Sequence, residues 1–363
     1  MRSTSFAREG RTTVSHTRAS IGSPVHENGL LHLLRHSIGR LLIVIAFVLS
    51  FSSSVIANVS AQATPSASPV ASPVVIADPL DAAVAWLVAQ QDPSGGFLGF
   101  SGTPDAGTTI DAALALASVP GVDQSVIDAA VAYLETSGAE YAAFGAGQAA
   151  KLVLLQAATG GNVNSINGID PLALVTGGVS ADTGLVGTGL FDHALGILAL
   201  AAAGQPVPSE WIDAAKSKQI ANGGWAYDGS SDEAAADSNT TALMIQALIA
   251  AGVANDDPAI VNALAYLKTT NVPGGGFAYS VADPLLADAN STGTVIQALV
   301  AAGIEPAGST EWGDVDPIQA LTNFQNPSGA FRYMDSVPDD NLFATVQAII
   351  GLTGVPYPVP ALS

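Results

Sequence analysis

The sequence predicts an all-α protein, an (α/α)6 toroid in which six outer helices surround six inner ones. The first observation is a set of internal repeats, the signature of a fold built from one recurring unit. The second is an alternation of two kinds of apolar segment: one kind is apolar or Ala on every side, and the other has a single apolar face. A ring of buried helices inside a ring of half-exposed ones satisfies this alternation. The sequence has no clear run of alternating β-branched residues, so we expect no β-sheet.

The inner helices are predicted from the repeats. Asp237–Gly252 aligns without a gap on Asp288–Gly303, and weaker copies begin at Asp105 and Asn341. Most of the predicted segments begin at Asp, Asn or Gly and end at Gly, which are helix start and stop signals. The predicted inner helices are Asp105–Val119, Tyr141–Gly160, Gly189–Gly204, Asp237–Gly252, Asp288–Gly303 and Asn341–Gly354.

The outer helices are predicted from the one-sided apolar segments between the inner ones. Pro or Ser stands near the first turn of each, where helices tolerate or favour these residues. We predict them at Pro79–Gln90, Ser125–Thr136, Pro171–Thr176, Pro208–Gln219, Pro258–Thr270 and Pro317–Gln325.

A loop motif, Q-x-x-x-G-x-aromatic, recurs between outer and inner helices, and one copy has Asn271 in place of Gln. The Gln side chain can bond backbone groups at a helix end, Gly permits a positive φ, and the aromatic ring can pack on the neighbouring repeat. We therefore expect the motif to join neighbouring repeats. These staple residues are Gln91, Gly95, Phe97, Gln219, Gly223, Trp225, Gly275, Phe277, Gln325, Gly329 and Phe331.

The composition excludes several classes of function. The 363 residues include 11 Lys and Arg against 31 Asp and Glu, a formal net charge of −20, so nucleic-acid binding is not expected. The absence of Cys excludes disulfides, iron–sulfur clusters, thiolate zinc sites and Cys nucleophiles. Beyond residue 63 the only His is His193, so we expect no metal and no cofactor.

The first 77 residues are interpreted as export and linker segments. The apolar run Leu41–Phe51 follows Arg35 and Arg40, and Ala61-Gln62-Ala63 fits an A-x-A cleavage site. Residues 1–63 therefore resemble a secretory signal, with an uncleaved membrane segment as the alternative. Residues 64–77 are rich in Pro, Ser and Ala and predict a disordered linker. The toroid is expected over residues 78–358, secreted or anchored at the membrane.

The copy that ends in Trp225 resembles the QW repeat of squalene-cyclase-type proteins, and the resemblance covers about Pro79 to Gly354. It implies the α/α-toroid fold of terpenoid cyclases, protein prenyltransferase β subunits, complement thioester domains and the cobalamin-binding intrinsic-factor/transcobalamin group. The prenyltransferase zinc site and the thioester both need Cys, which this chain lacks. The cobalamin binders add a second, β-rich domain for which we find no counterpart in the sequence.

Class II terpene cyclases carry D-x-D-D-T-A at the start of an inner helix, where the middle acid protonates the substrate. The segment Asp237-Ser-Asn-Thr-Thr-Ala resembles that motif, with Asn239 and Thr240 in place of two acids. Asn cannot deliver a proton to an alkene, and Thr is far too weak an acid. If the protein is a cyclase, the proton must come from Asp237, which matches the motif, or from another acid that has taken over, such as Asp111 or Asp192.

A polar rim is expected at one mouth of the ring. The inner helices of a toroid run parallel, so their N-termini gather there, above a cavity lined by Ala, Leu and Val. An apolar cavity with a few converging polar groups is the default ligand site, although most of these residues also suit N-caps. His193 could act as a general base, contact a ligand, or only form hydrogen bonds within the fold. The candidate ligand-binding residues are Asp105, Thr108, Asp192, His193, Asp237, Asn239, Thr240, Asp288, Asn290 and Asp340.

We therefore predict an exported, monomeric, noncatalytic protein that binds a small-molecule or lipid-like ligand, or a protein or cell-surface partner, in the toroid cavity or rim. One alternative is a class II cyclase-like enzyme with a degenerate acid motif. The other is an exported carbohydrate-active (α/α) barrel enzyme, which would need a pair of carboxylates about 5–9.5 Å apart. Its candidates are Asp105, Asp111, Asp192 and Asp237.

Overall fold

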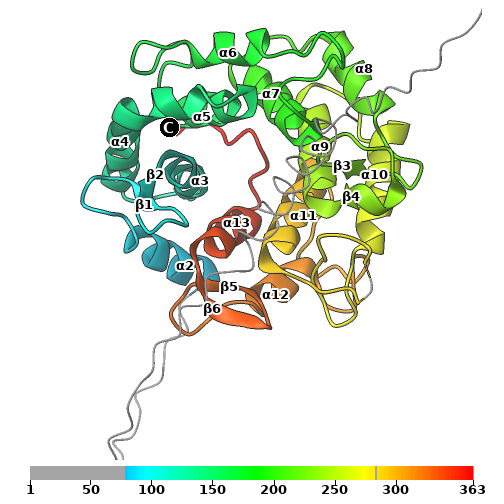
Figure 1. The fold of residues 1–363 in the computed structure, drawn as a ribbon. Coiled ribbons are helices and arrows are strands. Elements are labelled where there is room, and N and C mark those ends of the chain that lie inside the picture. Colours follow the sequence, from blue (N-terminus) through cyan, green and yellow to red (C-terminus); the bar gives the residue numbers. More distant parts are fainter. Residues whose placement is uncertain (1–77, 283, 363) are drawn as a thin grey trace, which may run out of the picture. The chain divides into compact units, whose positions relative to one another are not determined.

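The computed structural model describes residues 78–282 and 284–362, and here the helices are arranged as two concentric rings (Figure 1). The predicted signal and linker segments lie outside the described residues. The inner ring contains α3 (Ala106–Ala117), α5 (Ala146–Ala158), α7 (Leu190–Ala202), α9 (Ser238–Ala250), α11 (Ala289–Ala301) and α13 (Leu342–Thr353). The outer ring contains α2 (Pro79–Val88), α4 (Gln124–Ala142), α6 (Pro171–Gly177), α8 (Ser209–Ser217), α10 (Pro258–Thr269) and α12 (Pro317–Thr322). The predicted all-α toroid is confirmed.

Burial distinguishes the two rings as the sequence pattern predicts. Nearly every residue of α3 from Ala106 to Ala117 is buried, whereas α8 buries only Trp211 and Ala215. Each inner helix contacts the next, and α13 contacts α3, which closes the ring. The apolar core is therefore a continuous cylinder of inner helices covered by the outer ones. None of the helices in the described ranges combines the length and hydropathy that a membrane crossing requires.

Two local predictions were wrong. The second inner helix begins at Ala146, because Tyr141 belongs to the last turn of α4. The expected absence of sheet is also corrected. The described residues contain three short antiparallel hairpins: β1 (Phe97–Leu98) with β2 (Pro104–Asp105), β3 (Trp225–Ala226) with β4 (Ala236–Asp237), and β5 (Phe331–Met334) with β6 (Val337–Asn341). Strands of two to five residues are too short to show an alternating pattern.

Each hairpin joins a staple aromatic residue to the N-cap of the following inner helix. Trp225 pairs with Asp237, and the Trp225 backbone N–H donates to the hydroxyl of Thr241 at 3.0 Å. The same N–H-to-Thr bond, 2.8–3.0 Å long, recurs in every copy of the motif. The other pairs are Phe97 with Thr109, Phe277 with Thr292 and Phe331 with Thr345. A Thr four residues after the N-cap therefore has a structural role in this chain.

The staple Gln side chains connect successive outer helices. Gln325 Nε2 donates to the Gly329 carbonyl of its own loop at 2.9 Å and to the Pro79 carbonyl of α2 at 2.7 Å. Because Pro79 begins the first outer helix, this bond closes the outer ring. Gln91 and Gln219 bridge in the same way to α4 and α10. The repeated motif thus fixes the spacing between helix pairs around the circumference.

Candidate functional site

The cavity at the centre of the ring is lined by all six inner helices and by the segment that follows α13. It holds about 70 Å³ of space for the centre of a water molecule. One residue from each inner helix, six positions after its N-cap, forms a layer in this cavity: Asp111, Lys151, Leu195, Leu243, Thr294 and Gln347. Leu114, Leu154, Phe191, Gln297 and Tyr357 complete the lining. The layer is apolar on α7 and α9 and polar on the other four helices.

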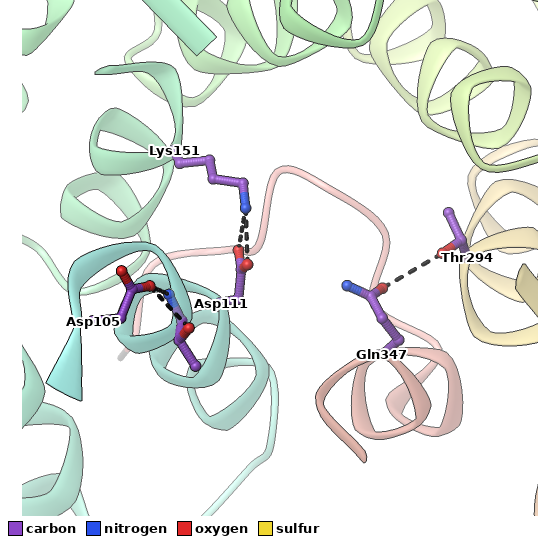
Figure 2. Close-up of polar contacts among 6 residues, drawn as sticks. Asp105, Asp111, Lys151, Thr294 and Gln347 are labelled. Atoms are coloured by element: carbon purple, nitrogen blue, oxygen red, sulfur yellow. Dashed lines mark hydrogen bonds and ion pairs between the residues drawn. The ribbon is translucent and has the colours of Figure 1, made fainter. Parts of the chain in front are cut away.

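An ion pair between neighbouring inner helices lies in this layer. Lys151 Nζ on α5 contacts the two carboxylate oxygens of Asp111 on α3 at 2.7 and 2.8 Å, and Figure 2 shows the two side chains meeting in the hollow. Burial by itself lowers the pKa of the Lys151 ammonium, but the charge and hydrogen bond of Asp111, together with Tyr141 and Tyr357, outweigh it and the net shift is upward. Lys151 is therefore a cation at physiological pH. Its ammonium has three N–H groups, so one is left for another acceptor.

Two amides face the same cavity from α11 and α13. Gln297 Nε2 donates to the Val355 carbonyl at 3.3 Å, while its Oε1 has no hydrogen-bond partner although the residue is only 1% exposed. The Gln347 Oε1 accepts a long bond of 3.4 Å from Thr294, and its Nε2 points into the hollow (Figure 2). A buried acceptor without a donor is costly, because it has lost its hydrogen bond to water. The cavity thus offers one unmatched acceptor and two donors.

A second, wider cavity shares Asp111 with the central one, and we call it the vestibule. It holds about 370 Å³ of space for the centre of a water molecule and lies between the β1–β2 hairpin and the N-terminal ends of α3 and α13. Phe100 and Phe343 are stacked there with ring centroids 4.2 Å apart. Its lining residues are Gly99, Phe100, Ser101, Asp105, Gly107, Thr108, Asp111 and Phe343. The vestibule has a stacked aromatic pair and, in Asp105 and Asp111, two carboxylates.

Among the residues predicted for the rim, Asp105 and Thr108 lie in the vestibule. Asp105 Oδ1 accepts from the Thr108 backbone N–H at 2.8 Å and from its hydroxyl at 2.9 Å. Asp192 accepts from the backbone N–H and the hydroxyl of Thr188, both at 2.9 Å. Asp340 is exposed and accepts from Asn326 in the β5–β6 hairpin region. The ligand roles of these residues stay predictions.

His193 is placed inside the wall between two elements. It is fully buried, its Nδ1 accepts from the Val186 backbone N–H at 3.0 Å, and its Nε2 lies 2.8 Å from the Trp211 carbonyl. Because Val186 can only donate, Nδ1 must be the acceptor and Nε2 must carry the proton. Burial lowers the pKa of this imidazole, so it is neutral. Both nitrogens are thus used in joining α7 to α8 and to the preceding loop.

Asp237 and Asp288 cap their helices from within the wall, and neither lines the central cavity or the vestibule. Asp237 Oδ1 accepts from the Thr240 backbone N–H at 2.7 Å, and its Oδ2 has no hydrogen-bond partner. Asp288 accepts from the backbone N–H and the hydroxyl of Ser291, both at 2.8 Å. Burial raises the pKa of each carboxyl to about 6. Pairing of Asp237 with Trp225 in a hairpin draws this carboxyl into the wall.

The residues two positions after each N-cap form a second layer. They lie on the same face of each inner helix as the layer that contains Lys151 and Asp111, one helical turn closer to the N-terminus. This second layer includes Asn239, at the position of the middle acid in the class II motif. Phe191 of this layer lines the central cavity, and Gly107 and Phe343 line the vestibule. The full layer is Gly107, Gly147, Phe191, Asn239, Asn290 and Phe343. It contains no carboxylic acid.

The raised pKa values predict a pH dependence of stability. A carboxyl whose pKa is higher in the folded chain than in the unfolded chain destabilises the fold as pH rises from about 4 to 6, because only the unfolded state ionises easily. We expect Asp237→Asn and Asp288→Asn each to raise the free energy of unfolding at pH 7 by about 1–3 kcal/mol and to flatten its pH dependence. Urea unfolding at pH 4 and pH 7 measures this. Asp78→Asn, at the exposed N-cap of α2, is the control and should change neither value. An unchanged pH dependence in both buried variants would contradict the expectation.

Sequence reasoning missed the residues at the centre of the ring. Lys151, Gln297, Gln347 and Tyr357 were not among the predicted site residues. A signal for Lys151 was present, because it is the only Lys or Arg in the six predicted inner helices. Counting six positions from the N-cap Gly145 places Lys151 in one layer with Asp111, but the predicted helix start at Tyr141 obscured this register. Within the described residues, no group of three or more His, Asp or Glu is arranged to hold a metal ion.

Comparison with known proteins identifies the architecture. No protein-family model and no curated protein matches the chain. Among solved structures, the type II terpene cyclase MstE from Scytonema matches with a TM-score of 0.56 and 18% identity over 76% of this chain and 96% of that one. A variant of MstE in complex with its substrate, geranylgeranyl dihydroxybenzoate, matches with a TM-score of 0.53, also at 18% identity over 76% and 96%.

A protein from Actinoplanes matches with a TM-score of 0.52 and 15% identity, over 76% of this chain and 97% of that one. At these identities the likeness concerns the backbone and leaves the chemistry of the site to be argued from the residues. The described chain therefore has the α/α-toroid fold that type II terpene cyclases share.

Proposed function

We propose that the chain is a noncatalytic protein that binds a small amphiphilic molecule in the central cavity and the vestibule. The observation that carries the proposal is the split lining of the central cavity. The Lys151–Asp111 pair and the unpartnered Gln297 Oε1 come from α5, α3 and α11, whereas α7 and α9 contribute only apolar side chains, Phe191, Leu195 and Leu243. An apolar hollow with a few converging polar groups is the usual form of a small-molecule site. The ligand's polar head needs both acceptor and donor atoms, as hydroxyl, phenol and carboxyl groups have.

The cavity volumes support a particular orientation of such a ligand. The central cavity, with about 70 Å³ of space for the centre of a water molecule, has room for a head group or a few waters. The hydrocarbon body must therefore extend past Asp111 into the vestibule, which offers about 370 Å³. There the stacked rings of Phe100 and Phe343 give it an apolar surface.

MstE supplies a chemically suitable probe. Its structures include complexes with geranylgeranyl dihydroxybenzoate and with merosterolic acid A. Geranylgeranyl dihydroxybenzoate has an isoprenoid body and a head with hydroxyl and carboxyl groups, which matches the polarity of the two cavities. We propose this class of molecule, an isoprenoid with an oxygen-rich head, as the ligand.

Binding of geranylgeranyl dihydroxybenzoate, measured by titration calorimetry, tests the proposal. Gln347→Leu removes a donor that faces the cavity, and the double variant Lys151→Met/Asp111→Asn replaces the ion pair by neutral groups. We expect each to weaken binding about tenfold or more. Lys216→Met is the matched control, because Lys216 forms a similar 2.6 Å pair with Asp257 on the outer helices. Absence of binding to the unmodified chain, or equal binding by all variants, would contradict the proposal.

A class II cyclase activity is the second candidate, favoured by the raised pKa and the unpartnered oxygen of Asp237. Against it, Asn239 stands where the family has its acid, and Asp237 lines neither cavity. The chain is incubated with squalene, geranylgeranyl diphosphate and geranylgeranyl dihydroxybenzoate, and the products are analysed by mass spectrometry. We expect none. A cyclised product that disappears in Asp237→Asn would establish the cyclase instead.

Export and a monomeric state also belong to the proposal. The support for export is the apolar run and the A-x-A site within residues 1–63, which lie outside the described residues. Fractionation of the native host, with detection in medium, membrane and cytosol, tests it. Recovery from the cytosol alone would contradict export, and a larger species by sedimentation would contradict the monomer.

A further inference from the structure

The segment that follows α13, residues 355–362, crosses the ring from α13 toward α5 (Figure 1, red). We call it the C-terminal segment. Backbone groups of the segment form hydrogen bonds with three different inner helices, two of them with Gln side chains. The Val355 carbonyl accepts from Gln297 at 3.3 Å, the Tyr357 N–H donates to Gln246 Oε1 at 2.9 Å, and the Leu362 N–H donates to the Ala158 carbonyl at 2.9 Å. The segment is therefore anchored across the end of the ring that lies opposite the helix N-termini.

The two glutamines that hold the segment occupy the same position in aligned repeats. Each lies in the sequence Ile-Gln-Ala-Leu, nine residues after the N-cap, and each is 1% exposed in a helix whose other buried residues are mostly apolar. A buried amide is costly unless its polar atoms are bonded. Gln246 and Gln297 satisfy part of that demand with the backbone of the C-terminal segment. Two inner helices thus provide a specific binding site for the backbone of this segment.

Tyr357 reaches the central cavity from the segment. Its side chain lines that cavity together with Lys151 and Asp111. Burial, followed by the Asp111 charge, raises the pKa of the Tyr357 hydroxyl, so it stays protonated. No hydrogen bond among the described residues uses this hydroxyl, which is therefore available as donor and acceptor.

We infer that the C-terminal segment is the floor of the ligand site and that Tyr357 contacts the ligand's head, so that it determines specificity for heads with a hydroxyl or carboxyl oxygen. This inference rests on the proposed function of the central cavity. Two observations support it: the segment closes the end of the hollow, and its one aromatic side chain lies beside the ion pair. The unpartnered Gln297 Oε1 lies in the same cavity and belongs to an amide that the segment positions. Donor atoms on the head would bond this oxygen, while its acceptor atoms would meet Lys151 and Tyr357.

Titration of the full chain with geranylgeranyl dihydroxybenzoate and with a C20 isoprenoid hydrocarbon tests the inference. Tyr357→Phe keeps the ring and removes only the hydroxyl. We expect it to weaken binding of the benzoate about five- to tenfold and to leave binding of the hydrocarbon unchanged. Tyr279→Phe, at a half-exposed tyrosine that lines neither cavity, is the matched control and should bind both like the unmodified chain.

The possible results separate the inference from the proposed function. Equal binding of the benzoate by the unmodified chain and by Tyr357→Phe overturns the inference and leaves the proposed function standing. Failure of the unmodified chain to bind the benzoate overturns both. A second readout is amide hydrogen exchange at Tyr357, which we expect to be protected in the unmodified chain and about tenfold faster in Gln246→Ala. Fast exchange in the unmodified chain would show that the floor is not formed.

Discussion

Lys151→Met should lower the free energy of unfolding by about 2–3 kcal/mol, because it leaves the Asp111 carboxylate in the hollow without its cation. Removing one partner of a fully buried ion pair typically costs about 3–5 kcal/mol. The side chains of Lys151 and Asp111 are 24% and 23% exposed to the hollow, so the expected cost is reduced by partial solvation. Chemical unfolding in urea measures it. The double variant Lys151→Met/Asp111→Asn removes both charges and should recover most of the loss.

Lys216→Met is the control for this experiment. Lys216 and Asp257 have similar exposed fractions, 31% and 25%, and a similar distance of 2.6 Å, but they lie on the outer helices in contact with bulk water. Surface pairs contribute about 0–1 kcal/mol, so this variant should change the free energy of unfolding very little. Equal losses for Lys151→Met and Lys216→Met would contradict the view that the hollow is a low-dielectric site.

Gly329→Ala should destabilise the chain by about 3 kcal/mol or more, because it disturbs the contact that closes the ring. Gly329 has φ of +95°, and an added Cβ would lie 2.5 Å from the Ala82 carbonyl oxygen of α2. The positive φ alone costs an L-residue about 1–2 kcal/mol. The clash adds to this, since α2 would have to move away from the loop and weaken the Gln325–Pro79 hydrogen bond.

Gly102→Ala separates these two causes. Gly102 also has a positive φ, +74°, but no atom lies within 4 Å of the position of the added Cβ. It should therefore cost only the backbone strain, about 1–2 kcal/mol. The midpoints of thermal and urea unfolding measure both variants. If Gly329→Ala were no more destabilising than Gly102→Ala, close packing of the loop on α2 would not be important for closing the ring.

The fold was largely predictable because local sequence signals mark the helix boundaries in most repeats. Asp and Pro mark the helix starts, Gly marks many of the ends, and the two kinds of apolar pattern separate inner from outer helices. The boundary between α4 and α5 was missed because residues 142–147 contain neither Pro nor an Asp or Asn cap, and the N-cap Gly145 is followed by another Gly two residues later. The hairpins were missed because their strands are only two to five residues long and are held to the next helix by one hydrogen bond to Thr. These features leave no periodic pattern.

The candidate site was less predictable because it depends on which face each polar residue occupies. Asp237 and Asp288 were predicted for the rim, yet both are buried in the wall as N-caps. Lys151 and Asp111 come together only because α3 and α5 are neighbours in the ring. Tyr357 reaches the cavity through a segment without regular secondary structure, and residues far away in the sequence hold it. Such contacts cannot be predicted from local patterns.

The central claim is that the hollow of the ring holds a small amphiphilic molecule whose head lies at Lys151 and Asp111. Native mass spectrometry of the protein purified from its own host, under conditions that preserve noncovalent complexes, tests it most directly. We predict an added mass that corresponds to an oxygen-bearing isoprenoid, present in the unmodified chain and strongly reduced in Lys151→Met/Asp111→Asn. The same added mass in both proteins, or the bare chain mass in both, would contradict the claim.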